Sequence, residues 1–293
     1  MSDLDISIVI INFNTKELTR QCIESIYEKT RQISFEVILV DNASTDGSMY
    51  ELPNLTHDKY HYIYNDKNIG FSRANNQASK KARGKYLFFM NSDMIFVNDV
   101  LSILTEYMKK FKVTGIAGPR FLNPDRSLQV SCRNFPNIIF GSLKFFPFLK
   151  IFLTREAMSY YQKDRDYSKI QIVDTVSAGA MFIEKKLFEK IGGFDEFSFM
   201  YGEDADICRQ VRDRGLEVSF IPDALLVHYG GQSSKLNSHR AIWSYYFAFY
   251  YLYKKYYFGW FGVILKPIFG IRALVAIFVN LFKKDKRITW NNK

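Results

Sequence analysis

Three apolar runs, each followed directly by Asn or Asp, constrain the fold of this chain more than any other feature of its sequence. The runs are Ser7–Ile11, Phe35–Val40 and Tyr86–Met90. Continuous apolar, β-branched runs are typical of strands that are covered on both faces, as in parallel sheets. Leu18, Cys22 and Ile26 recur at helical spacing between the first two runs. Strand, helix and strand in this order predict an α/β fold with a parallel sheet and right-handed crossovers.

The polar residues that end these runs are expected to share one rim, because ligands of such sheets collect at the carboxyl ends of the strands. They are Asn12-Phe13-Asn14, then Asp41 to Ser48, then Asn91-Ser92-Asp93. The second cluster is equally well explained as an ordinary turn and helix N-cap. Neither a GxGxxG motif nor a P-loop follows the first two runs, which argues against an NAD enzyme or a P-loop NTPase.

Two further polar positions belong to the same expected rim. Asn68–Asn76 opens another helix, which Ser72 is expected to cap, and Arg73 there either reaches a base or phosphate or is simply solvated. His228 follows an expected strand, Ala224–Val227, and is either a metal ligand, a phosphate donor or a structural histidine.

A stretch from Gly192 to Asp206 places five carboxylates among glycines and aromatic residues, directly before a helical pattern. Apolar residues follow Asp204 at i+3, i+4 and i+7, so Asp204 should lie above the apolar face of that helix, whereas Asp206 should point elsewhere. Partial desolvation raises the pKa of a carboxylate and suits it to accept a proton, although a helix N-terminus favours its ionised form. Glu203 and Asp204 are equally well explained as caps of the helix.

Composition limits the class of protein. With 293 residues, of which 47% are hydrophobic and 24% charged, the chain can form one large folded domain, alone or with an appendage. Its three cysteines are too few and too scattered for a disulfide framework or a zinc site. The acidic start lacks a signal-peptide pattern, so a reducing, cytoplasmic setting is expected.

The C-terminal part of the chain differs from the rest. The net charge is +10, but nine Lys and Arg against one acid lie beyond Tyr253, so the body is nearly neutral and a nucleic-acid partner is not expected. Thirteen of the nineteen residues from Trp243 to Phe261 are aromatic. Beyond Lys255, charges at Lys266 and Arg272 limit uncharged runs to ten residues, whereas a span needs roughly 20, so this region should lie in a membrane interface. Packing of the aromatic residues on the body or on a second subunit is the alternative.

Taken in order, seven segments resemble the inverting glycosyltransferase family 2, and within it bacterial rhamnosyltransferase-like members. The segments are Ser7–Asn14, Asp41–Ser48, Asn68–Asn76, Phe89–Asp93, Gly179–Ile183, Gly192–Asp206 and His228–Ser233. The resemblance implies a GT-A fold, a nucleotide-binding α/β sandwich with a mostly parallel central sheet. It would cover residues 1–237, with a nucleotide-binding half at 1–118 and an acceptor half at 119–237. Residues 238–293 would form an aromatic, basic helical appendage that associates with membrane.

The resemblance also implies how the nucleotide sugar is bound. Asp41 matches the acid that pairs with the base, and Asn12, Phe13 and Asn14 match the stretch that lines the nucleoside. Arg73 falls near a basic residue that contacts the base or the diphosphate, and Asn76 of the same segment is assigned to the nucleotide sugar.

For catalysis, the resemblance assigns a metal site and an acid pair. Asn91, Ser92 and Asp93 match the DxD motif, with Asp93 as the ligand of Mg²⁺ or Mn²⁺, and His228 matches a histidine that completes the metal shell in some members. Asp204 matches the catalytic base, and Glu203 would position acceptor or sugar hydroxyls.

Two departures from the family pattern bear on this assignment. Asn91 replaces the first acid of DxD, which bears on metal affinity and on whether the chain is active. Asp174-Thr175 stands where many relatives have an aromatic residue, which bears on acceptor or sugar preference.

The expected reaction is inverting, metal-dependent transfer of a sugar, with dTDP-β-L-rhamnose as the first candidate donor, to a hydroxyl of a polyprenyl-linked glycan. The enzyme would work in bacterial surface polysaccharide synthesis at the inner face of the membrane. A nucleotidyltransferase and an inactive GT-A relative acting as a scaffold are the rivals. The sequence leaves open the sugar, the base, the acceptor, the linkage and the oligomeric state, a homo-oligomer included.

Overall fold

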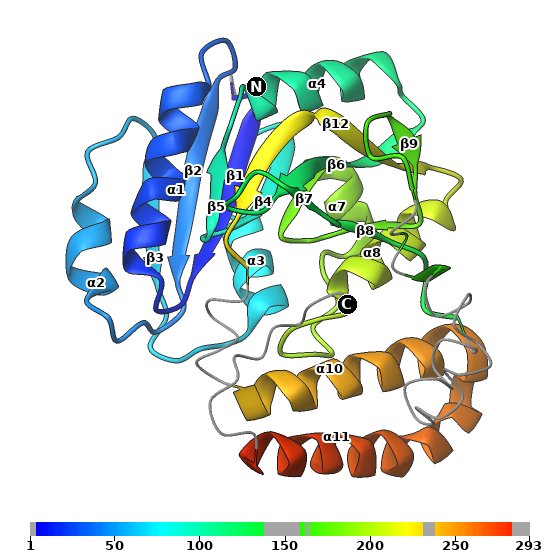
Figure 1. The fold of residues 1–293 in the computed structure, drawn as a ribbon. Coiled ribbons are helices and arrows are strands. Elements are labelled where there is room, and N and C mark those ends of the chain that lie inside the picture. Colours follow the sequence, from blue (N-terminus) through cyan, green and yellow to red (C-terminus); the bar gives the residue numbers. More distant parts are fainter. Residues whose placement is uncertain (1–3, 138–158, 161, 163–164, 231–237, 283–293) are drawn as a thin grey trace.

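The computed structural model describes residues 4–137, 159–160, 162, 165–230 and 238–282 (Figure 1). The irregular segment Cys132–Ile170, expected to be an insertion that contributes to an acceptor site, is therefore described only at its two ends. Most of the basic residues of the tail, those beyond Phe282, lie outside the described residues.

A mixed sheet of ten strands forms the centre of the body. Its parallel half has the order β3-β2-β1-β4, with β1 (Ile6–Asn12), β2 (Phe35–Asp41), β3 (Tyr60–Tyr64) and β4 (Tyr86–Asn91). The other half continues as β11 (Ala180–Glu184), β6 (Thr114–Leu122), β12 (Glu217–His228) and β5 (Met94–Phe96). β11 is antiparallel to β4 and β6, and β12 runs parallel to β6. The expected mostly parallel α/β sheet is confirmed.

Four short strands complete the sheets of the body. β7 (Leu128–Gln129) pairs with β6, and β9 (Gln171–Ile172) pairs with β12. A separate two-stranded sheet joins β8 (Cys132–Arg133) to β10 (Thr175–Val176), so two segments far apart in sequence lie side by side.

Helices cover both faces of the sheet (Figure 1). They are α1 (Lys16–Lys29), α2 (Ser48–Glu51), the 3₁₀ turn Leu52–Asn54, α3 (Phe71–Ser79), α4 (Val100–Lys110), α7 (Lys185–Ile191) and α8 (Glu203–Arg212). Alternate residues of β1 belong to different clusters, because successive side chains of a strand point to opposite faces. Ile8 packs in the cluster of α1 and α4, whereas Val9 packs in the cluster of α3 and α8.

The structure corrects three details of the expected elements. Glu217–Ile221 and Ala224–Val227 are one strand, β12, with a register shift between Ile221 and Leu225. The helix expected to be capped by Ser72 begins at Phe71, and the Ser72 hydroxyl is buried without a hydrogen-bond partner among the described residues. β3 and β5 were not expected at all.

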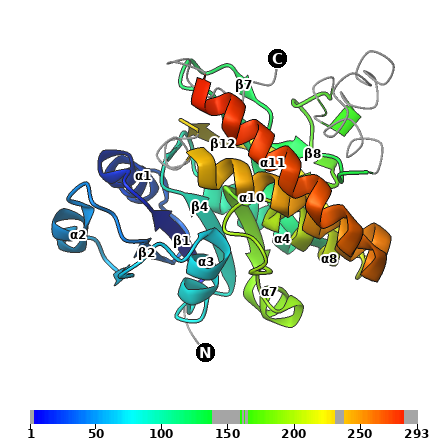
Figure 2. The same ribbon diagram turned by 90° about the horizontal axis from the view of Figure 1, so that it is seen from below.

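The C-terminal segment forms a helical hairpin on the body. α10 (Ser238–Tyr253) is followed by a π-helical turn (Lys254–Phe258), a 3₁₀ turn (Gly259–Ile264) and α11 (Leu265–Phe282). α10 lies between the body and α11 in both views (Figures 1 and 2). Aromatic residues of α10, among them Phe249 and Tyr253, are buried together with Phe269 of α11. Packing of these aromatic residues on the protein itself is thus confirmed for α10.

Candidate active site

A pocket of about 470 Å³ opens where the carboxyl ends of the parallel strands meet the second sheet and the C-terminal hairpin. The site residues predicted from the sequence that line it are Phe13, Asn91, Ser92, Asp93, Glu203, Asp204 and His228. The sheet topology thus brings together residues from both halves of the chain. Asn12, Asn14, Asp41, Arg73 and Asn76 do not line it.

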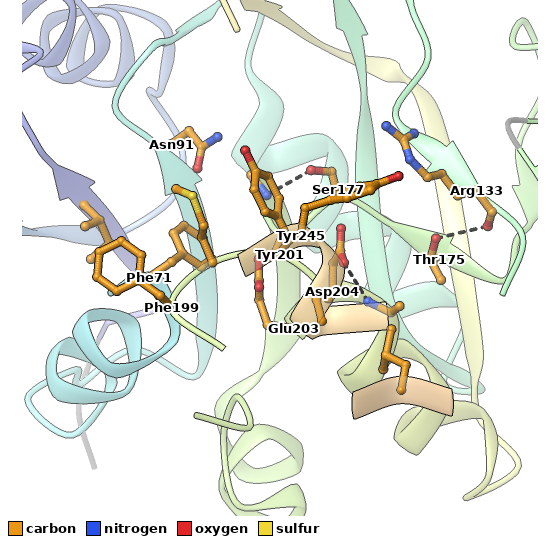
Figure 3. Close-up of a pocket in the computed structure, with 18 of the residues that line it drawn as sticks. Phe71, Asn91, Arg133, Thr175, Ser177, Phe199, Tyr201, Glu203, Asp204 and Tyr245 are labelled. Carbon is orange, nitrogen blue, oxygen red and sulfur yellow. Dashed lines mark hydrogen bonds between the residues drawn. The ribbon is translucent and has the colours of Figure 1, made fainter. Parts of the chain in front are cut away.

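Glu203 and Asp204 lie at the start of α8 and reach into this pocket (Figure 3). A sharp turn precedes them, with left-handed φ angles of 74° at Tyr201 and 86° at Gly202. Glu203 is 7% exposed, and its Oε2 is buried without a hydrogen-bond partner among the described residues. Asp204 is half-buried, and its Oδ1 accepts a hydrogen bond from the backbone N–H of Ala205 at 2.8 Å. The Ala205 N–H is one of the free donors in the first turn of α8, so Asp204 contributes to capping the helix, as one of the two explanations of this residue expected.

Burial raises the pKa of both acids, and the charge of one separates its ionisation from that of the other. Burial, and next the charge of Asp204, raise the pKa of Glu203 to about 8. Burial also raises the pKa of Asp204, while the Ala205 N–H and the charge of Arg133 oppose that rise. Because the Asp204 charge contributes to the shift of Glu203, Asp204 ionises first. Between the two ionisations the pair therefore offers one ionised carboxylate and one carboxylic acid.

Polar and aromatic side chains surround the acid pair. Figure 3 shows Tyr201 and Tyr245 beside it, with Arg133 and Thr175 together on one side. The Thr175 hydroxyl donates to the Arg133 carbonyl at 3.0 Å, which ties the two strands of the second sheet. Sequence reasoning missed Arg133, because only the pairing of β8 with β10 brings it to the site. Asp174-Thr175 is the second departure from the family pattern. Thr175 lines the pocket, whereas Asp174 forms an ion pair with Arg212.

Asp93 and His228 also line the pocket, and they lie on adjacent chain segments. β5 pairs with the end of β12, matching Met94 with His228, and the Tyr229 N–H donates to the Asp93 carbonyl at 3.0 Å. These backbone bonds place His228 Nε2 3.4 Å from Asp93 Oδ1. The expected proximity of the two side chains is confirmed.

Asn91 and Ser92 are held by close packing next to them. A Cβ atom at position 179 would lie 2.9 Å from Asn91 Nδ2 and 3.1 Å from the end of the Met94 side chain, so a larger residue there would displace these side chains. The Ser92 hydroxyl lies 2.8 Å from that of Thr15, which connects this loop to the start of α1.

Asn12, Asn14 and Asp41 are next to lining residues in the chain but are not part of the pocket wall. Asp41 is fully buried, and its carboxylate accepts from Asn12 Nδ2 at 2.9 Å and from the Ser44 N–H at 2.7 Å. Asn14 accepts from the Thr45 N–H at 2.6 Å. These bonds shape the loops at the ends of β1 and β2, and a contact of Asp41 with a base stays a prediction. The wall itself includes residues that were not singled out: Ile11, Asn42, Asn68 and Phe71.

Arg73 and Asn76 do not line the pocket, and their contact with the nucleotide sugar stays a prediction. Three residues apart, they share one side of the helix. Arg73 forms an ion pair with Glu196 at 3.2 Å, and Asn76 accepts from the Phe194 N–H at 2.9 Å and donates to its carbonyl at 2.8 Å. Both residues hold the loop that precedes α8.

The C-terminal hairpin supplies one wall of the pocket. Its lining residues there are Tyr245, Ala248, Phe249 and Leu252, all on α10. Below them Asp206 is fully buried, where it meets Lys255 Nζ at 2.7 Å and the Tyr256 hydroxyl at 2.7 Å. Asp206 does leave the pocket side of α8, but it faces the hairpin rather than solvent. α10 is thus part of the pocket wall, and the turn that follows it is anchored to α8.

Residues 7–192 match the sequence profile described as Glycosyl transferase family 2. The chain belongs to this family. A second profile, described as the N-terminal domain of galactosyltransferase, matches residues 159–230 of the glycosyltransferase.

Curated relatives are identical to the glycosyltransferase at about one aligned residue in four. The O-antigen biosynthesis protein RfbC of Myxococcus xanthus is 25% identical over 242 residues, covering 80% of this chain but 18% of that protein. The N-acetylglucosaminyl-diphospho-decaprenol L-rhamnosyltransferase of Mycobacterium tuberculosis is 25% identical over 214 residues, covering 68% and 67% of the two chains. The rhamnosyltransferase WbbL of Escherichia coli is 26% identical over 174 residues, covering 57% of this chain and 63% of that protein.

Solved structures confirm the GT-A fold. The mannosyltransferase of Pyrobaculum calidifontis, in complex with GDP-Man and Mn²⁺, superposes with a TM-score of 0.59 at 16% identity, over 98% of this chain and 77% of that one. GalNAc-T7 with UDP, GalNAc and Mn²⁺ superposes with a TM-score of 0.58 at 15% identity, over 82% of this chain and 47% of that one.

The side chains at the rim suit a divalent ion of the kind that these two structures contain. Two ligands at right angles on an octahedral ion, with bonds of about 2.1 Å, lie about 3 Å apart, close to the 3.4 Å between His228 Nε2 and Asp93 Oδ1. No group of three or more His, Cys, Asp and Glu gathers among the described residues, so the remaining ligands would be phosphate oxygens, water or Asn91.

Proposed function

We propose that this glycosyltransferase transfers a sugar from a nucleotide diphosphate to a hydroxyl of a lipid-linked glycan acceptor, with inversion at the anomeric carbon, in bacterial surface polysaccharide synthesis. The observation that carries the proposal is that one pocket holds two adjacent carboxyl groups with raised pKa values together with an Asp–His pair.

The chemistry needs one base. An acceptor hydroxyl is a poor nucleophile until a base removes its proton, and Asp204 is the carboxylate of the pair that ionises first. Direct displacement by that hydroxyl inverts the anomeric carbon. Protonated Glu203 can donate a hydrogen bond to a sugar or acceptor hydroxyl from the oxygen that has no partner among the described residues.

On the donor side, Asp93 and His228 would hold Mg²⁺ or Mn²⁺. The ion would neutralise the charge that develops on the leaving diphosphate. Phe13, Asn42 and Phe71 offer an aromatic and amide-bearing wall for the nucleoside.

We take dTDP-β-L-rhamnose as the donor to test first, because two relatives are named as rhamnosyltransferases. One of these is named for an acceptor on diphospho-decaprenol, which supports a polyprenyl-linked acceptor here. The test is a transfer assay with dTDP-, UDP- and GDP-sugars and a polyprenyl-diphosphate-linked sugar, with the product anomer read by NMR. A retained configuration, or transfer of the nucleotidyl group instead, would overturn the proposal.

Removal of one metal ligand gives a second test. Asp93→Ala is expected to lose most of the Mn²⁺-dependent gain in nucleotide-sugar affinity and at least tenfold in transfer, because Asp93 is the carboxylate ligand at the rim. Isothermal titration with and without Mn²⁺ measures the first effect. Asp99→Ala, which removes only the cap of α4, is the matched control. Full activity of the wild type after exhaustive chelation would refute the metal dependence.

We further propose that α11 lies in the inner membrane interface, parallel to the bilayer. His239–Leu281 is long and apolar enough to span a membrane by length and composition. Only 17% of its most apolar stretch is buried in the protein, so most of that stretch is free to contact lipid. The outward face of α11 is apolar along its length, with exposed Ile268, Ile271, Leu274, Val275, Phe278 and Val279. α10 is attached to the body, so the hairpin can present this face without crossing. The basic residues of the tail add attraction to anionic lipid.

Polar substitutions on that face test the membrane proposal. The double variant Ile271→Ser, Phe278→Ser should bind anionic liposomes at least tenfold more weakly in a flotation assay, since burying each such side chain contributes roughly 1.5–3 kcal/mol. Donor binding should not change. Ile170→Ser, Ile172→Ser, which alters two exposed apolar residues of the body, is the control. If the wild type fails to float with anionic and neutral liposomes, or self-associates through α11 instead, the proposal is wrong.

A further inference from the structure

Gln129 lies beside His228 on the side of the ring that faces away from Asp93. We propose that Gln129 is a positioning residue, which fixes His228 in the tautomer that offers its Nε2 lone pair to a divalent ion. The proposal rests on the metal-dependent function above.

A hairpin delivers Gln129 to this place. β7 folds back on β6, which pairs Gln129 with Phe121, and β6 in turn pairs with β12. Gln129 Oε1 thereby lies 2.5 Å from His228 Nδ1. The ring of Phe121 packs edge-on against the imidazole at 5.5 Å, so the ring plane is held as well.

Two hydrogen bonds determine which way the Gln129 amide points. Its Nε2 donates to Asn123 Oδ1 at 2.9 Å and to the His228 carbonyl at 3.2 Å. Asn123 is oriented in turn, because its own amide nitrogen donates to the Ser127 hydroxyl at 2.9 Å and to the Leu128 carbonyl at 3.3 Å. The amide nitrogen of Gln129 is therefore committed to acceptors, and its oxygen faces the ring.

An oxygen that can only accept requires a proton on His228 Nδ1. In the neutral ring, Nε2 then carries the lone pair, and this atom faces Asp93 Oδ1 at 3.4 Å. Two acceptors at this distance repel each other unless a cation lies between them. Gln129 thus favours metal binding by excluding the tautomer whose Nε2–H would instead donate to Asp93, as partners of metal-bound histidines commonly do.

The tautomer can be read directly by ¹⁵N NMR of the imidazole in the metal-free full chain, at a pH where the ring is neutral. We expect protonated Nδ1 and bare Nε2 in the wild type. Gln129→Leu should shift the population toward protonated Nε2. Gln129→Glu keeps an acceptor at Nδ1 and should preserve the wild-type tautomer, while Gln171→Leu, on β9, is a control for loss of a glutamine outside the site.

Metal affinity gives the second readout. Titration of Mn²⁺ followed by EPR, in the presence of UDP or dTDP, should show binding weakened roughly 10- to 100-fold in Gln129→Leu, with a smaller loss in Gln129→Glu. Circular dichroism and thermal melting verify that the variants fold. A wild-type ring protonated on Nε2, or equal Mn²⁺ affinity in a folded Gln129→Leu, would overturn the proposal. Neither readout requires sugar transfer, so failure of the enzymatic proposal appears separately, as absent product with the tautomer intact.

Discussion

Asp204→Asn is expected to lower sugar transfer by roughly 10²–10⁴-fold, the usual contribution of a positioned general base, while leaving donor binding unchanged. Asn cannot take the proton of the acceptor hydroxyl, yet it keeps the size of Asp and an oxygen that can accept from the Ala205 N–H. Single-turnover transfer rates and titration with the nucleotide sugar measure the two effects. Near-normal turnover by this variant would refute the assignment of the base.

Glu203→Gln is the matched control for this prediction. The wild-type rate should fall on the acid side, as Asp204 takes up a proton above its ordinary pKa, and on the alkaline side, as Glu203 loses its proton near its pKa of about 8. Gln stays neutral and can still donate, so the alkaline fall should disappear in this variant. If Glu203 were the base instead, the wild-type rate would rise through pH 8, and Glu203→Gln would be the inactive variant.

Lys255→Met is expected to destabilise the protein by about 3 kcal/mol, because removal of one partner leaves a buried carboxylate without its counter-charge. Asp206 is fully buried, and Lys255 Nζ lies 2.7 Å from it and 2.9 Å from Asp195. The Tyr256 hydroxyl and Gln210 Nε2 still donate to Asp206 in the variant, which limits the loss. Urea unfolding measures the change.

The double variant Lys255→Met, Asp206→Asn separates charge from packing. With neither charge left in the buried site, most of the lost stability should return, and a double variant as unstable as Lys255→Met alone would contradict the explanation. The same contacts predict that a chain ending near Ser238 would not keep donor binding. Such a chain would expose Asp206 and lose the pocket wall formed by α10.

The central strands could be predicted from the sequence, whereas the strands at the margins could not. β1, β2 and β4 are covered by helices on both faces, so their residues are continuously apolar. β3 is only half-buried and rich in tyrosine, and β5 has three residues, so neither leaves an apolar run long enough to recognise.

The site shows the same division. Asp93, Asp204 and His228 were predictable because strand ends and one helical face place them. Arg133 was not, because its position depends on pairing with a strand some forty residues later in the chain. The burial of Asp206 depends on Lys255 and the α10 wall, and no local pattern around α8 encodes contact with a segment so distant.

One continuous set of buried hydrogen bonds joins the two ends of the donor site. It runs from Asp41 through Asn12 to Thr15, and from the Thr15 hydroxyl to Ser92, next to Asp93. Loops that share such bonds cannot be ordered independently, so ordering of the nucleoside loop lowers the entropy that remains to be lost at the metal loop. The effect is reciprocal by thermodynamic necessity: whatever factor a nucleotide adds to the affinity for the ion, the ion adds to the affinity for the nucleotide. Donor and ion would then act as mutual effectors within one pocket.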